Sequence, residues 1–152
     1  MIPLLDVNVL LPAHRRDHPD HHHMLRYVDG LRAGRVFFGV PELALSAVVR
    51  IATSSSVFKP SLSTTDEALN FAAGVIASPK CLLVRPSEKH WRVFENLARR
   101  VGACGKSVPD AYLAAMAIDQ GFEFITNDKD FARFPGLTWR HPLAAQGVTN
   151  PN

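Results

Sequence analysis

Acidic side chains follow two short apolar runs in this sequence of 152 residues. Asp6 comes directly after the run 2–5, and Asp128 and Asp130 come just after the run 122–125. Carboxylates that folding brings together repel one another, and a divalent cation with oxygen ligands can stabilise them. Such a cation polarises a phosphoryl oxygen and activates a bound water, which is the chemistry of phosphodiester hydrolysis.

Two further acids lie where helices are expected to begin. Asp110 falls in the first turn of the helix expected at 108–120, and Glu42 opens the helix expected at 41–53. Each has a purely structural interpretation, because first-turn acids interact favourably with the helix dipole and Asp110 could close a capping box with Ser107. Taken one at a time, these acids leave both interpretations open.

The acids after the last apolar run also have a structural interpretation. Asp128 and Asp130 could cap a short helix that begins near Lys129, because aspartate is a favoured capping residue. Asp6 is harder to explain in this way, since capping the following turn is its only evident structural role and a buried acid usually needs a partner.

The hydrophobic pattern alternates between short apolar runs and segments of helical period. Continuous runs of this length are typical of strands buried on both faces, and apolar residues every three or four positions are typical of helices. Capping signals support the helices, since Glu67 follows Thr64 at the spacing of a capping box and Gly121 ends the last long helix. The expected strands are 2–5, 36–38, 81–84 and 122–125, and the expected helices are 41–53, 64–76, 87–101 and 108–120.

Strands that alternate with helices predict an α/β fold with a central parallel sheet and right-handed crossovers. In such sheets, sites form beyond the carboxyl ends of the strands, where the loops of different strands meet. If the first and fourth strands are neighbours, Asp6 and Asp128 face each other. Several acids at one end of one sheet, Asp110 among them, favour a single site over independent helix caps.

Size, composition and charge fit one globular domain. The chain is 47% hydrophobic and 20% charged. Its net charge is +3, and the sequence lacks the dense basic stripe of a dedicated nucleic-acid binder. Cys81 and Cys104 have no CxxC spacing, so we expect reduced thiols and a cytoplasmic protein. No apolar run approaches the roughly 20 residues of a membrane span, and Asp6 comes too early for the apolar core of a signal peptide.

Two polar segments invite other interpretations. The segment HPDHHH at 18–23 could suggest zinc, but three consecutive histidines cannot face one metal from a helix, and no cysteine completes a tetrahedral set. The segment GACGKS at 102–107 lacks the first glycine of a phosphate loop and follows a helix rather than a strand. We interpret it as a connection in which Lys106 could contact RNA.

An aromatic stripe lies in the expected helix 87–101. Trp91, Phe94 and Leu97 recur at helical spacing, which could suggest stacking on bases. Such a stripe more often packs in the core or at a dimer interface, and we favour that role.

Three motifs together resemble the PIN-domain ribonucleases of the VapC toxin class. They are LLDVNVLL near the start, VPDAYLAAMAIDQG in the middle and FITNDKDFARFPGL near the end. Their order and spacing are more specific than any one motif. The resemblance implies a three-layer α/β/α domain with a central parallel sheet over residues 1–143. The polar residues 144–152 are expected to form a flexible tail.

The resemblance also implies an activity and partners. It implies a ribonuclease that uses Mg²⁺ or Mn²⁺, is silenced by a cognate VapB-like antitoxin and commonly forms a homodimer. At the matching positions Asp6, Asp110 and Asp128 would be metal ligands. Asn8 would support the site, and Thr126 begins the terminal motif that contains Asp128.

One acid of the family pattern is missing. The family places a glutamate inside the second-motif helix, just before an aliphatic pair and an arginine, and this sequence has Ala47 there, before the segment VVR. Glu42 is the nearest substitute. Its reach to the same ion depends on how the helix begins.

The sequence therefore predicts a metal-dependent endoribonuclease, the toxin of a toxin-antitoxin pair, in which Asp6, Asp110 and Asp128 hold the ion and Glu42 or Asp130 orients or deprotonates the water. The missing glutamate motivates an alternative, a PIN-like module with a degraded site that binds RNA or protein without cleavage. A small-phosphate hydrolase with the same ion is a third option. Metal-dependent RNA cleavage separates the first from the second, and turnover of mononucleotides identifies the third.

Overall fold

The computed structural model of the protein describes residues 1–57 and 61–152. Within these residues, short strands alternate with helices as the hydrophobic pattern predicts. In chain order the elements are β1 (Pro3–Leu5), α1 (Val7–His14), α2 (His21–Ala33), β2 (Phe38–Pro41), α3 (Glu42–Ala52), α4 (Thr65–Ile76), β3 (Cys81–Val84), α5 (His90–Val101), α6 (Ser107–Gln120), β4 (Glu123–Ile125), the 3-10 helix η1 (Lys129–Arg133), β5 (Thr138–Arg140) and β6 (Val148–Thr149).

The sheet has a parallel core and one antiparallel edge. Its strand order is β3-β2-β1-β4-β5-β6, and each neighbouring pair is parallel except β5 with β6. The chain moves outward from β1 to β3 on one side and then returns to β4 on the other side of β1. The boundary between β1 and β4 is therefore the topological switch point, where α/β sheets form their sites.

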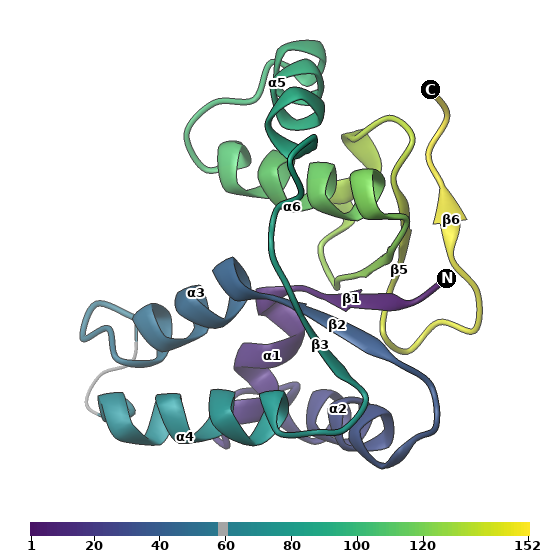
Figure 1. Ribbon diagram of the computed structural model, residues 1–152. Helices are drawn as coiled ribbons and strands as arrows, with labels where there is room; N and C mark the ends of the chain where they lie inside the picture. Colours follow the sequence, from purple (N-terminus) through teal and green to yellow (C-terminus); the bar gives the residue numbers. More distant parts are fainter. Residues whose placement is uncertain (58–60) are drawn as a thin grey trace.

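Helices cover both faces of the sheet and give three layers (Figure 1). Helices α5 and α6 cover one face, and α1 to α4 cover the other. The strand side chains alternate accordingly: Leu4 and Phe124 join the core under α5 and α6, whereas Leu5 and Ile125 join the core under α1 to α4. All four are fully buried. The predicted three-layer α/β/α fold is confirmed.

Helix ends follow the capping signals in the sequence. The Thr64 hydroxyl accepts the Glu67 amide at 3.1 Å, which is the N-cap bond of the predicted capping box, and donates to the Glu67 carboxylate at 3.1 Å. Gly121 has a left-handed conformation with φ of 72° and ends α6. Helix α6 has 14 residues, and no helix in residues 1–57 and 61–152 is long and apolar enough to cross a membrane.

The C-terminal segment differs from the flexible tail expected at 144–152. Residues Val148–Thr149 form β6, which pairs with β5. Asn150 is buried, and its side-chain amide donates to the carbonyls of Phe131 at 2.9 Å and Phe134 at 2.8 Å. A strand of two residues is too short to show a periodic pattern, so the polar composition of this segment did not predict its pairing with β5.

Candidate active site

The strand register brings the ends of β1 and β4 to the same edge of the sheet. Leu5 of β1 pairs with Ile125 of β4, so the residues that follow both strands leave the sheet together. The Asp6 amide donates to the Ile125 carbonyl at 3.0 Å, which extends the pairing by one residue. The first and fourth predicted strands are therefore neighbours, as the convergence of the acids requires.

Asp6 is a buried carboxylate at the start of α1. Its exposed fraction is 5%. One carboxylate oxygen accepts the Val7 amide at 2.7 Å, and the other accepts the Thr126 hydroxyl at 2.8 Å. Among residues 1–57 and 61–152, no lysine, arginine or histidine forms an ion pair with Asp6. Capping explains one of the two oxygens, but it does not explain an acid buried without a cation.

Thr126 fixes the positions of its neighbours in the site. It is fully buried. Its hydroxyl donates to Asp6 and accepts both the Asn8 side-chain amide at 2.9 Å and the Asp128 backbone amide at 3.0 Å. These three bonds use the single donor and both lone pairs of the hydroxyl. Asn8 also accepts the Asn127 amide at 3.1 Å, which ties the turn after β4 to α1.

Asp128 and Asp110 approach Asp6 from different elements. Asp128 caps η1 by accepting the Asp130 amide at 2.8 Å, so it has the structural role considered from the sequence. Asp110 lies in the first turn of α6. The capping-box interpretation of Asp110 is wrong, because the Ser107 hydroxyl instead bonds the backbone amide and carbonyl of Cys104, each at 2.9 Å.

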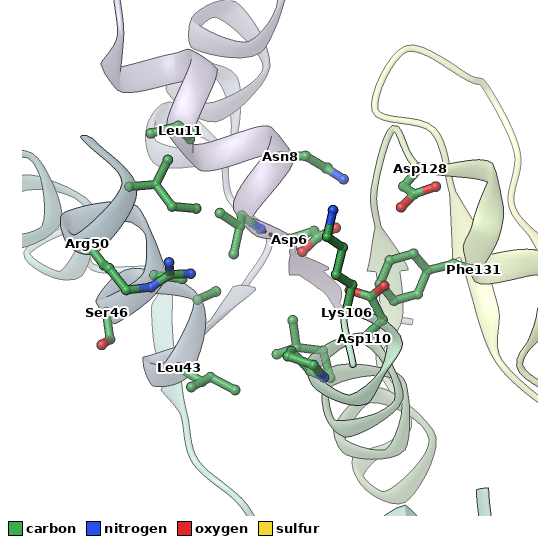
Figure 2. Close-up of a pocket in the computed structure, with 16 residues that line it drawn as sticks. Asp6, Asn8, Leu11, Leu43, Ser46, Arg50, Lys106, Asp110, Asp128 and Phe131 are labelled. Atoms are coloured by element: carbon green, nitrogen blue, oxygen red, sulfur yellow. Dashed lines mark hydrogen bonds between the residues drawn. The ribbon is translucent and has the colours of Figure 1, made fainter. Parts of the chain in front are cut away.

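Asp6, Asp110 and Asp128 line one cavity of about 560 Å³. Figure 2 shows Asp6 in the middle of this cavity, Asp110 and Asp128 on the side of α6 and η1, and helix α3 on the opposite side. Two cations, Arg50 and Lys106, also line it. The structure thus brings together the three aspartates that the sequence assigned to one metal site.

Burial and mutual repulsion shift the pKa values of two of these acids. Burial raises the pKa of Asp6 to about 7; the hydrogen bonds from Thr126 and Val7 oppose this, and the charges of Asp110 and Asp128 add to it. Burial also raises the pKa of Asp110, and the nearby charge of Asp128 raises it further. The ionised forms are therefore disfavoured until a positive charge enters the cavity.

A hard divalent cation fits the donors of this cavity. They are carboxylate, amide and hydroxyl oxygens without sulfur or imidazole, and such donors suit Mg²⁺ or Mn²⁺. In residues 1–57 and 61–152, no group of three or more His, Cys, Asp or Glu side chains is placed to hold a metal alone. Because Mg²⁺ keeps several waters and takes only one or two carboxylates directly, this open arrangement is compatible with it.

Glu42 and Asp130 lie outside the lining of the cavity. Glu42 is the first residue of α3, is exposed, and forms an ion pair with Arg85 beside a separate surface hollow. Asp130 is also exposed and forms an ion pair with Arg133 at 3.1 Å. Helix α3 begins in an orientation that turns Glu42 away, so within residues 1–57 and 61–152 no glutamate lines the cavity in place of the acid absent at Ala47.

The aromatic stripe of α5 is partly buried. Leu97 is buried, and the Phe94 ring contacts the Tyr112 ring of α6 with centroids 5.4 Å apart. Trp91 contacts Phe94 but is 65% exposed. Packing is confirmed for Phe94 and Leu97, whereas Trp91 lies at the surface.

Sequence reasoning missed the side of the cavity that α3 forms. Leu43, Ser46, Ala47 and Arg50 all line it. Their spacing of three, four and seven residues places them on one face of a helix, which is a signal present in the sequence. Leu43 and Arg50 are ordinary residues of an amphipathic helix, so their types alone do not indicate that this face belongs to a site.

The fold and the cavity define an α/β/α protein with an acidic site at the switch point of a mostly parallel sheet. The PIN domain family matches residues 4–137. Ribonuclease VapC43 of Mycobacterium tuberculosis is 37% identical over 142 residues, which are 93% of this chain and 96% of that protein. Ribonuclease VapC31 of the same organism is 37% identical over 139 residues, or 91% and 97%.

A solved structure shares the fold at lower identity. The structure of VapBC2 from Rickettsia felis bound to a DNA fragment from their promoter matches with a TM-score of 0.67 at 17% identity, over 93% of this chain and 98% of that one. At this identity the likeness concerns the fold alone. The family match and the two relatives show that the chain belongs to the PIN domain family, among the VapC ribonucleases.

Proposed function

We propose that the protein is an endoribonuclease that hydrolyses RNA phosphodiester bonds with Mg²⁺, or Mn²⁺, and that it is the toxin of a toxin-antitoxin pair. The observation that carries the proposal is the convergence of Asp6, Asp110 and Asp128 on one cavity, where none of them forms an ion pair within residues 1–57 and 61–152. Relatives named VapC ribonucleases support RNA as the substrate.

Asp6, Asp110 and Asp128 would hold the cation. When bound, a divalent ion supplies charge stabilisation of the phosphoryl group and lowers the pKa of a water. Thr126 keeps Asp6 and Asp128 in place through its hydroxyl. We give Glu42 no part in holding the ion or handling the water, because it lies outside the cavity and pairs with an arginine.

The cavity cations have a role in the proposal, whereas Asp130 has none. The side chain of Asp130 points away into its pair with Arg133, so we assign it no proton transfer. Arg50 and Lys106 would bind the phosphates of the RNA backbone, because both line the cavity that contains the acids. The polynucleotide would therefore cross from α3 to α6 over the carboxylates.

We further propose a VapB-like antitoxin, a homodimer and a cytoplasmic location. The matching solved structure is that of VapBC2 from Rickettsia felis, which supports the antitoxin partner. RNA as the substrate motivates the location. Co-purification with the product of a neighbouring small reading frame and the mass of the free protein in solution test the partner and the dimer.

Cleavage of RNA by the purified protein tests the activity. We expect cleavage in Mg²⁺, none in EDTA, and a loss of about 1,000-fold in Asp110→Asn, because a bound ion contributes several kcal/mol to the reaction. Asp29→Asn on the exposed side of α2 is the matched control and should cleave as the wild type does. Equal cleavage by Asp110→Asn and Asp29→Asn would show that the activity comes from another site or from a contaminant.

One observation favours the alternative of a binding module. Ala47 lines the cavity, so the wall opposite Asp110 presents a methyl group where the family pattern has a carboxylate. A protein of this kind would bind RNA with the same affinity in Mg²⁺ and in EDTA and would leave it intact. Metal-dependent cleavage that Asp110→Asn removes excludes it.

A further inference from the structure

The cavity has a second half that the metal chemistry does not use. Leu43, Ser46, Ala47 and Arg50 form a continuous face of α3, and Leu11 of α1 adjoins it. Figure 2 shows this face across the cavity from Asp110 and Asp128. We call these five residues the α3 shelf. It is apolar at its centre and carries a cation at one end.

The side chains of the shelf leave room for a ligand. Leu43 is 43% exposed although it is a large apolar residue. Ala47 is half-buried at the centre of the shelf, where its methyl group adds little volume. A cavity of about 560 Å³ that combines an apolar lining with a few charged groups is typical of a preformed site for a small group.

Two cations flank the shelf and the acids. The Arg50 guanidinium extends from α3 into the cavity, and the Lys106 ammonium extends into it from the α6 side (Figure 2). Within residues 1–57 and 61–152, neither side chain forms an ion pair. The cavity therefore combines two cations, an apolar surface and carboxylates, and cations and apolar surfaces are the groups that contact the phosphates and bases of single-stranded RNA.

We propose that the α3 shelf binds the nucleoside next to the scissile phosphate, with its base on Leu43 and Ala47 and the following phosphate on Arg50. This inference rests on the proposed ribonuclease function. It assigns the shelf to RNA rather than to a peptide because the two cations of the cavity, Arg50 and Lys106, suit a polyanion. The absence of a carboxylate at Ala47 then serves base binding, since an acid there would repel the strand and fill the shelf.

Coupling between the protein and the substrate tests the proposal. The substrate is an RNA oligonucleotide around a mapped cleavage site, and a second version lacks the base at each flanking position in turn. In the wild type, removal of one flanking base should lower kcat/KM about tenfold. Ala47→Leu fills the shelf and should lower kcat/KM on the intact RNA by the same factor, with no further loss when that base is removed.

Three measurements separate this effect from misfolding or metal loss. Ala73→Leu on the exposed side of α4 is the matched control and should cleave both substrates as the wild type does. Mn²⁺ affinity should be the same in Ala47→Leu and in the wild type. Arg50→Met provides a second cycle, since its loss of about tenfold should disappear on RNA with an uncharged methylphosphonate at the neighbouring linkage.

Each outcome bears on one proposal. If the losses from Ala47→Leu and from base removal multiply at both flanking positions, the two changes act independently. That result overturns the shelf proposal and leaves the proposed nuclease function intact. Unchanged cleavage by Ala47→Leu together with weaker binding of a VapB-like antitoxin makes the shelf a peptide site and also overturns it. If the wild type cleaves no RNA in Mg²⁺ or Mn²⁺, the proposed function fails and the shelf proposal fails with it.

Discussion

Helix α1 carries a buried carboxylate at its first end and a buried guanidinium at its last. Asp6 precedes the helix with 5% of its surface exposed, and Arg15 follows it with 6% exposed. Arg15 bonds Asp17 at 2.9 and 2.5 Å, the Ser63 hydroxyl at 3.0 Å, and the Ser61 carbonyl. Both charges have the sign that the helix dipole favours, so the dipole does not distinguish the two ends.

The two ends differ in how the charge is compensated. The charge on Arg15 is balanced by Asp17 and by polar oxygens of the protein, which is how a buried charge is stabilised for structure. Asp6 has hydrogen-bond donors but two further acids, Asp110 and Asp128, as its charged neighbours. The protein thus balances the charge at one end with its own groups, whereas at the other end no cationic side chain of residues 1–57 and 61–152 forms an ion pair with Asp6. This contrast, rather than burial alone, marks the functional end.

The largest expected effect comes from removing the charge at the first end. Asp6→Asn should lower RNA cleavage about 1,000-fold, because a ligand of the ion is lost. It should also raise the melting temperature in EDTA, since a neutral amide is cheaper to bury than a carboxylate. Asp29→Asn is the exposed control for both measurements. A variant that cleaves normally, or that melts lower in EDTA, would contradict the contrast between the ends.

The opposite result is expected at the last end. Arg15→Met should lower the free energy of unfolding by about 2 kcal/mol, because it leaves the polar groups of Ser61 and Ser63 without their donor. Folded protein should keep its cleavage rate, since Arg15 lies outside the acidic cavity. Arg16→Met, at the exposed neighbouring position, should change neither quantity. Urea unfolding curves give the stability, and an Arg15→Met protein as stable as Arg16→Met would show that this charge is not structural.

Thr126 offers a test of positioning at the first end. Thr126→Val removes the hydroxyl that orients Asp6 and holds the Asp128 amide, so cleavage should fall about 10- to 100-fold. Thr126→Ser keeps the hydroxyl and should remain within a few-fold of the wild type. If valine and serine variants have equal rates, the hydroxyl does not position the acids.

A further expected effect is a dependence of stability on pH. The folded pKa of Asp6 is raised from 3.8 to about 7, so the folded protein holds a proton that the unfolded chain releases. In EDTA, its stability relative to Asp6→Asn should be greatest below about pH 4 and should decline as pH rises to 7. Melting temperatures of both proteins between pH 4 and 8 give this difference. A difference that stays flat over this range would show that Asp6 is ionised throughout.

Three acids of the site could be proposed from the sequence for a clear physical reason. Acids that follow buried strands are few, and sites in parallel sheets form beyond the strand ends, so Asp6 and Asp128 would face each other if the first and fourth strands were neighbours. The pairing of β1 with β4 meets that condition. Asp110 could be added to these two acids because it lies in the first turn of α6, the helix that precedes β4. The buried Asn150 and its strand could not be foreseen, because they depend on contacts with β5 and η1 that leave no local pattern.

The two predicted site residues that lie outside the cavity, Glu42 and Asp130, do so for the same reason. Glu42 and Asp130 were chosen by their position near a strand or helix end, but a side chain's direction there depends on a turn or two of backbone. Each instead pairs with an arginine, Arg85 or Arg133, which sequence distance does not reveal. The α3 shelf was not predicted, because the helical spacing of its residues is present in the sequence but does not show that this face of α3 lines the cavity.

Metal binding without RNA tests the central claim most directly. Titration of the wild type, Asp6→Asn and Asp29→Asn with Mn²⁺, followed by calorimetry and melting temperature, asks whether an external cation completes the first end of α1. We predict saturable binding that raises the melting temperature of the wild type and Asp29→Asn, with affinity at least about tenfold weaker in Asp6→Asn. Equal affinity in all three proteins, or no binding to the wild type, would contradict the account.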